Sequence, residues 1–137
     1  MKRSEAREIV FKIIFQKDFH DDFETIYPRL IEESLVKGVQ KEYVVQTLKG
    51  ILDNFDVING VIASNLKQDW SMERLPKIAV ALLRLGVYEL LFSDSIPDIT
   101  AIDEAVKLAF AYCDSKDATF INGVLHKVYE QKKGKSQ

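Results

Sequence analysis

Residues 78–92 read IAVALLRLGVYELLF, and Arg84 and Glu89 are the only charged residues in this segment. The periodicity of this segment, like that of the rest of the chain, is helical. A helix that is apolar on all sides lies in the interior of a globular protein. We therefore expect residues 78–92 to form a buried central helix around which the second half of the chain packs.

Helical periodicity continues on both sides of this segment. We expect helices over about 4–19 and 23–36, the second ending near Gly38, and a long third one over 44–66. Two further helices follow the central one, with apolar stripes over 102–110 and 120–128. The predicted fold class is all-α, as two consecutive bundles of about three helices each, with domains at 1–69 and 70–137.

The composition is that of a globular protein, with 47% hydrophobic and 29% charged residues among 137. A single cysteine, Cys113, excludes an internal disulfide framework and favours a reducing compartment. No apolar run reaches the ~18–20 residues of a membrane span, and the N-terminus lacks a signal-peptide core. We expect a soluble cytoplasmic protein without a membrane partner.

The net charge of −2 argues against a protein that binds nucleic acid through bulk charge alone. The charges are nevertheless unevenly distributed. Two basic ends flank an acidic stretch over 18–33: the first includes Lys2, Arg3 and Arg7, and the second begins after Leu125. Arg3 and Arg7 lie one helical turn apart, in line with Phe11. This pattern indicates either a local cationic and aromatic site or ordinary solvated surface charge.

The residues that usually carry chemistry are sparse. His20 and His126 have no cysteine or histidine at metal-ligand spacing, so we expect no metal site. There is no glycine-rich phosphate loop or dinucleotide motif, so we expect no cofactor. Nothing near Cys113 suggests thiolate activation. We predict no catalytic residues and a protein that is not an enzyme.

Three groups of motifs occur in a characteristic order. They are Arg3…Ala6-Arg7-Glu8…Phe15-Gln16, then Trp70-Ser71-Met72-Glu73-Arg74-Leu75 followed by Leu83-Arg84-Leu85-Gly86-Val87-Tyr88-Glu89-Leu90-Leu91, and finally Ile96-Pro97, Ala101-Ile102-Asp103-Glu104-Ala105-Val106 and Phe120-Ile121-Asn122-Gly123-Val124-Leu125. In this order and spacing they resemble the NusB family of bacterial transcription antitermination factors. The resemblance covers almost the whole chain.

The resemblance implies an all-helical RNA-binding factor without enzymatic activity. Members of the family pair with NusE, a small-subunit ribosomal protein, and bind the boxA element of ribosomal RNA leader transcripts. They act with RNA polymerase and other Nus factors in an antitermination complex. By this analogy, the residues at the RNA surface are Lys2, Arg3, Arg7, Lys116, Phe120 and Asn122, and those at the NusE surface are Phe11 and Phe15.

Several alternatives stay open. Phe120 is either a core residue or a base-stacking one, and Asn122 is bonded internally or lies at the RNA rim. For Arg84 we expect an ion pair with Glu104 or Glu89, with RNA contact as the alternative, because an unpaired buried charge is very costly. Ala79-Val80 replaces a charged pair found in many family members, so this region is a partner surface, core or a self-association surface.

The chain as a whole also admits other roles. A NusB-like protein-interaction module with weak or no RNA binding is the alternative function, and a homodimer is possible because the first helix is unusually apolar. Some ribosomal RNA methyltransferases carry a similar N-terminal domain. We expect no such enzyme here, because its cofactor domain would have to follow Gln137, where this sequence ends.

Overall fold

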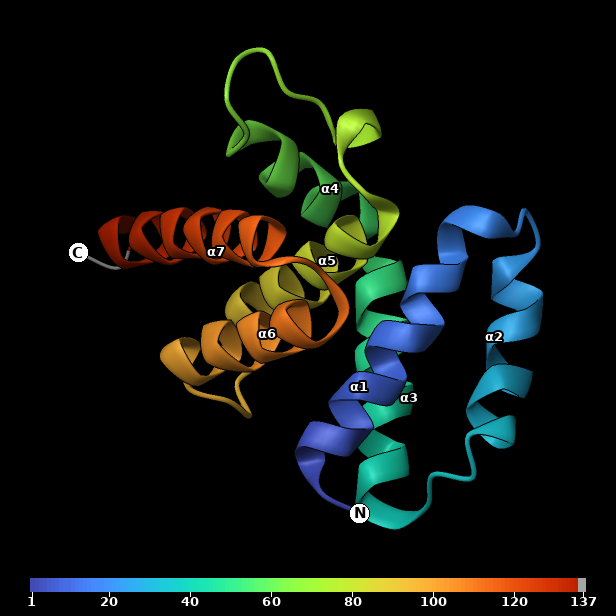
Figure 1. The fold of residues 1–137 in the computed structure, drawn as a ribbon. Coiled ribbons are helices and arrows are strands. Elements are labelled where there is room, and N and C mark those ends of the chain that lie inside the picture. Colours follow the sequence, from blue (N-terminus) through green and yellow to red (C-terminus); the bar gives the residue numbers. More distant parts are fainter. Residues whose placement is uncertain (136–137) are drawn as a thin grey trace.

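The computed structural model describes residues 1–135, which form seven α-helices and two short 3-10 helices without any strand (Figure 1). The elements are α1 (Arg3–Phe15), η1 (Gln16–Phe19), α2 (Phe23–Glu33), α3 (Gly38–Asp53), α4 (Phe55–Ser64), η2 (Met72–Arg74), α5 (Lys77–Phe92), α6 (Asp98–Tyr112) and α7 (Ser115–Lys135). The predicted all-α fold class is confirmed.

Helix α5 lies at the centre of the molecule. Every residue from Ala79 to Leu90 is buried, and α5 packs against α1, α3, α4, α6 and α7. Figure 1 shows α6 and α7 on one side of it and the pair α1 and α3 on the other. The helix is apolar all round because neighbours surround it. The predicted division at residues 69 and 70 falls between α4 and η2, and it stays a prediction.

The long third helix expected over 44–66 is two helices. Asn54 ends α3 and starts α4, and its side-chain Nδ2 donates a hydrogen bond to the Gly50 carbonyl at 2.8 Å. Asparagine favours such breaks because its side chain competes for backbone hydrogen bonds. The apolar spacing continues across the break because both helices pack against α5.

The ends of the first two helices also differ from the expectation. The α-helical part of the first ends at Phe15 and continues as the 3-10 turn η1. Helix α2 ends at Glu33, and Gly38 is the first residue of α3 rather than the end of α2. Gly38 has a φ of +63°, a left-handed conformation that glycine adopts at no steric cost.

Candidate nucleic-acid interface

The first turn of α1 presents two cations at the surface. Lys2 is exposed, and Arg3 is held against α3. The Arg3 Nε donates to Gln40 Oε1 at 2.7 Å, and its guanidinium carbon lies 4.2 Å from the centroid of the Tyr43 ring. Its terminal N–H groups make no hydrogen bond to any residue in 1–135. A guanidinium held in this way can donate to a phosphate.

Arg7, one turn further along, is buried instead. Only 4% of it is exposed, and its Nε and Nη2 donate to the two oxygens of Glu89 at 2.7 and 3.2 Å. Its Nη1 lies 3.5 Å from Glu104, and the Tyr43 hydroxyl also donates to Glu89, at 3.1 Å. The prediction that Arg7 contacts RNA is therefore corrected. Because the carboxylates of Glu89 and Glu104 both pair with Arg7, neither of them forms an ion pair with Arg84.

The pKa values of this buried network follow from its geometry. Burial alone would lower the pKa of Arg7, but the hydrogen bond and negative charge of Glu89 raise it above its ordinary value. Burial, together with the charge of Glu89, raises the pKa of Tyr43. Arg7 therefore stays charged and Tyr43 stays neutral at physiological pH.

Arg84 is paired with Asp18, and the predicted ion pair with Glu104 is wrong. Its Nη1 donates to Asp18 Oδ2 at 3.1 Å, and its Nε donates to Asn59 Oδ1 at 2.9 Å. Its guanidinium carbon lies 4.4 Å from the centroid of the Phe55 ring. Burial lowers the pKa of Arg84, and the charge of Asp18 acts against this shift. Arg84 joins α5 to η1 and α4 rather than to α6.

The aromatic end of α1 is only partly accessible. Phe11 is buried, with its ring centroid 5.0 Å from that of Tyr112 and 6.4 Å from that of Phe15. The prediction that Phe11 contacts a partner is therefore corrected, because Tyr112 already covers it. Phe15 is half-buried and packs against the exposed Phe19, at 5.1 Å between centroids. Phe15 and Phe19 together form an aromatic surface.

The first turns of α7 carry the other predicted RNA residues. Phe120 is half-buried, with its ring stacked on Trp70 at 6.2 Å and 30°. Lys116 is exposed and one turn from Phe120, on the same helix face. Asn122 is half-buried, and its amide bonds to no residue in the described part of the chain. Phe120 thus lies at the edge of the core with part of its ring accessible.

Trp70 was not predicted as a site residue, although 49% of it is exposed. It lies in the segment between α4 and η2, where sequence periodicity gives no information about the direction of a side chain. The sequence feature that could have identified Trp70 is a large aromatic side chain in an otherwise polar loop. Its stacking on Phe120 makes a continuous aromatic surface of two rings.

The predicted residues form two separate surfaces. Lys2 and Arg3 are at the start of α1, where Arg3 contacts Gln40 and Tyr43 of α3, whereas Phe120 is in α7 and stacks on Trp70, two residues before η2. Figure 1 shows the start of α1 apart from α7. The Tyr112 hydroxyl donates to Glu8 at 2.8 Å and joins the end of α6 to α1.

Ala79 and Val80, which depart from the family pattern, are both buried on α5. Of the alternatives for this region, the structure places these two residues in the core. The half-buried Ile78 and the exposed Lys77 precede them at the start of the helix.

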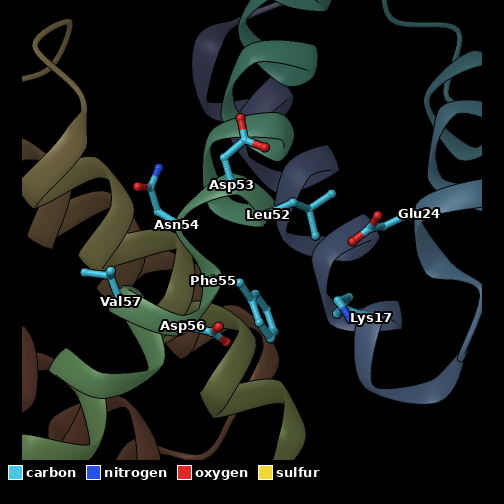
Figure 2. A pocket seen from close by; sticks show the side chains of 8 residues that line it. All are labelled: Lys17, Glu24, Leu52, Asp53, Asn54, Phe55, Asp56 and Val57. Atoms are coloured by element: carbon cyan, nitrogen blue, oxygen red, sulfur yellow. The ribbon is translucent and has the colours of Figure 1, made fainter.

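A hollow of about 480 Å³ opens between η1, α2 and the junction of α3 with α4 (Figure 2). Its lining includes the carboxylates Glu24, Asp53 and Asp56, and Lys17 lies with its Nζ 4.9 Å from the centroid of Phe55. Three carboxylates against one ammonium group would repel a phosphate backbone. We therefore place the candidate nucleic-acid interface elsewhere.

Among residues 1–135, no helix is long and apolar enough to cross a membrane. The same residues contain no group of three His, Cys, Asp or Glu side chains placed to hold a metal ion. Burial and the nearby carboxylates of Asp117 and Asp114 raise the pKa of Cys113, which reduces its thiolate fraction at neutral pH.

The fold and its surfaces define a small helical protein that presents basic and aromatic side chains separately from a buried ion-pair network. Basic side chains beside accessible aromatic rings are typical of proteins that bind single-stranded nucleic acid. The chain belongs to the NusB family, whose pattern matches residues 4–130.

Individual relatives agree with this membership. The transcription antitermination protein NusB of Clostridium botulinum (strain Kyoto / Type A2) is 37% identical, over 93% of this chain and 99% of the relative. The protein of the same name from Pseudothermotoga lettingae is 38% identical, over 93% and 90%.

Solved structures extend the likeness to the fold. NusB of T. maritima superimposes with a TM-score of 0.86 at 33% identity, covering 95% of this chain and 92% of that one. A NusB chain in a crystal structure of antitermination factors NusB and NusE in complex with dsRNA gives a TM-score of 0.83 at 27% identity, covering 94% and 96%.

Proposed function

We propose that this protein is a transcription antitermination factor that binds boxA-type single-stranded RNA of ribosomal RNA leader transcripts together with NusE. In this role it acts in the cytoplasm, within a complex of RNA polymerase and other Nus factors, and it works by binding rather than by catalysis. The observation that carries the proposal is the match to NusB relatives over more than nine-tenths of the chain. A structural neighbour, in a crystal structure of NusB and NusE in complex with dsRNA, supports NusE as a partner and RNA as the class of ligand.

The accessible residues suggest how the RNA is held. Lys2 and the free N–H groups of Arg3 contact phosphates at the start of α1, where the helix dipole also favours an anion. Phe120 and Trp70 provide an aromatic platform on which unpaired bases stack. Lys116 supplies a further cation beside it, and Asn122 supplies an unbonded amide. These contacts are few, so binding is modest and salt-dependent without a partner.

The aromatic surface formed by Phe15 and Phe19 is where we place NusE. It lies at the far end of α1 from Arg3 (Figure 1), so a partner bound there leaves the cationic end of the helix free. Lys77 lies at the edge of this surface, with its Nζ 5.9 Å from the centroid of the Phe19 ring. In a homodimer the same surface would be covered by a second copy.

A titration with labelled RNA tests this function. BoxA-type single-stranded RNA, the same sequence scrambled, and the boxA-type duplex are each mixed with the protein, with and without NusE, at two salt concentrations. We expect the boxA-type single strand to bind most tightly, more tightly with NusE, and more weakly as salt increases. Failure of every RNA to bind at low salt would support the alternative of a protein-interaction module. Equal affinity for the scrambled RNA would exclude a specific boxA factor.

A further inference from the structure

A second, smaller hollow lies between α3 and the end of α5, close to Arg3. Its volume is about 250 Å³, below the range of about 300–1,000 Å³ that is usual for sites holding drug-sized ligands. It has room for a single ring system rather than for a whole nucleotide. Its lining comprises Tyr43, Gln46, Thr47, Tyr88, Phe92, Ser93, Asp94 and Ser95.

Aromatic rings form much of the wall. Tyr88 and Phe92 are stacked at 6.0 Å and 19°, and 38% of Phe92 remains exposed, so part of its ring is free to receive another ring. Tyr43 borders the hollow with its hydroxyl already donated to Glu89. The face of a flat, aromatic ligand would find a stacking surface here.

Thr47 indicates that the hollow suits a polar ligand. It is only 4% exposed, yet its hydroxyl makes no hydrogen bond to any residue in 1–135. Within residues 1–135, every fully buried side-chain nitrogen or oxygen atom has a hydrogen-bond partner. Because the Thr47 hydroxyl has no partner among these residues, it is not fully buried, and it is open to the hollow that Thr47 lines. Buried polar groups normally have a hydrogen-bond partner. Gln46 at the rim also has no partner within the described chain.

The charge in the lining of the hollow does not favour a phosphate. Asp94 is the only charged residue in its lining, and a carboxylate repels a phosphate but accepts a hydrogen bond from an amino group or a ring N–H. The neighbouring cation is Arg3, which lies over the Tyr43 ring. A phosphate held by Arg3 would therefore lie next to a hollow that takes an uncharged ring.

We propose that this hollow takes one unpaired nucleobase of the bound RNA, stacked on Phe92 and hydrogen-bonded to Thr47, while Lys2 and Arg3 hold the adjoining phosphates. The inference rests on the proposed RNA-binding function and adds a base site on α3 and α5, away from Phe120 on α7. Single-stranded RNA is commonly read in this way, by splaying out a base and contacting both its face and its edge.

A double-mutant cycle between protein and RNA tests the base site. The protein variants are Phe92→Ala and Thr47→Val, with Phe110→Ala and Thr25→Val as matched controls at exposed positions of α6 and α2. Each is titrated, with NusE present, against boxA-type RNA and against versions with one abasic nucleotide at each position in turn. Thermal unfolding verifies that each variant is folded.

We expect Phe92→Ala to bind the intact RNA about 5- to 100-fold more weakly, as loss of one base–aromatic stack predicts. Thr47→Val should weaken binding about 2- to 10-fold, as loss of one hydrogen bond predicts. At one RNA position the abasic substitution should cost the wild type at least as much as Phe92→Ala does, and should cost the Phe92→Ala variant clearly less than it costs the wild type, because only the contact with Thr47 is left to lose.

The experiment distinguishes a failure of the base site from a failure of the proposed RNA-binding function. If the wild type binds the RNA but Phe92→Ala and Thr47→Val bind as the controls do, the base site is wrong and the proposed function stands. The base site is also wrong if the abasic and Phe92→Ala losses add at every RNA position. If Phe92→Ala does not fold, the same cycle with Thr47→Val tests the base site, and losses that add at every RNA position again show that the base site is wrong. If the wild type binds none of the RNAs, both proposals fail.

Discussion

Replacing Arg7 with Met is expected to lower the free energy of unfolding by about 3–5 kcal/mol, the usual cost of removing one partner of a buried ion pair. Glu89 is 1% exposed, and Arg7 provides both of the charged hydrogen bonds that it accepts. Without Arg7, Glu89 keeps only the Tyr43 hydroxyl as a donor. Urea unfolding followed by circular dichroism measures the change.

Arg3→Met provides the matched control. Arg3 is on the same helix and is cationic, but it is only partly buried and forms no ion pair with any residue in 1–135. Its loss should therefore change the free energy of unfolding by at most about 1 kcal/mol. The double variant Arg7→Met/Glu89→Met should recover much of the lost stability because it leaves no unpaired charge at Glu89. A fully stable Arg7→Met variant with weakened RNA binding would contradict the structural role assigned to Arg7.

Gly50→Ala is expected to destabilise the protein by about 1–3 kcal/mol, through overpacking. Gly50 is the point where α3 approaches α5, and a methyl group there would overlap the phenol ring of Tyr88. Tyr88 is held between Gly50 and Phe92, with which it is stacked, so the ring cannot move without disturbing the neighbouring contact. Thermal or urea unfolding gives the difference from the wild type.

Gly60→Ala is the control, because the same substitution there should change the free energy of unfolding in the opposite direction. Gly60 also lies inside a helix, α4, but nothing lies within 4 Å of an added methyl group. Alanine should therefore stabilise the protein by about 0.5–1 kcal/mol through its higher helix propensity. Equal effects at the two positions would show that the Gly50–Tyr88 contact is not close.

The fold could be predicted from the sequence because its main signal is local. The 78–92 segment is apolar on every face, and this alone indicates a buried helix. The break at Asn54 could not be predicted in the same way, because both α3 and α4 pack against α5 and their apolar spacing continues across it.

The ion pairs depend on contacts between residues distant in sequence. Arg7 and Glu89 are separated by 82 positions, and Arg84 and Asp18 by 66, so no local pattern reports either pair. One signal was available: Arg84 and Glu89 are five residues apart, or about 140° around a helix, and so face different neighbours. This separation makes an Arg84–Glu89 pair unfavourable, but it cannot identify Asp18.

The candidate RNA and partner surfaces could be predicted only in part, because they too depend on contacts between residues distant in sequence. The cationic start of α1 is visible in the sequence, but the sequence does not show that Arg3 stays accessible while Arg7 is covered by α5 and α6. Likewise, the family resemblance implies a partner surface that includes Phe11. Tyr112, about 100 residues away, covers that ring within the same chain.

The central claim is that the start of α1 holds RNA through Arg3 while Arg7 holds the fold. The most direct test is the slope of log K against log salt concentration for boxA-type RNA, measured with saturating NusE for the wild type and for Arg3→Gln. We predict that Arg3→Gln lowers the magnitude of the slope by about one, as loss of one phosphate contact requires. An unchanged slope for Arg3→Gln would contradict the account.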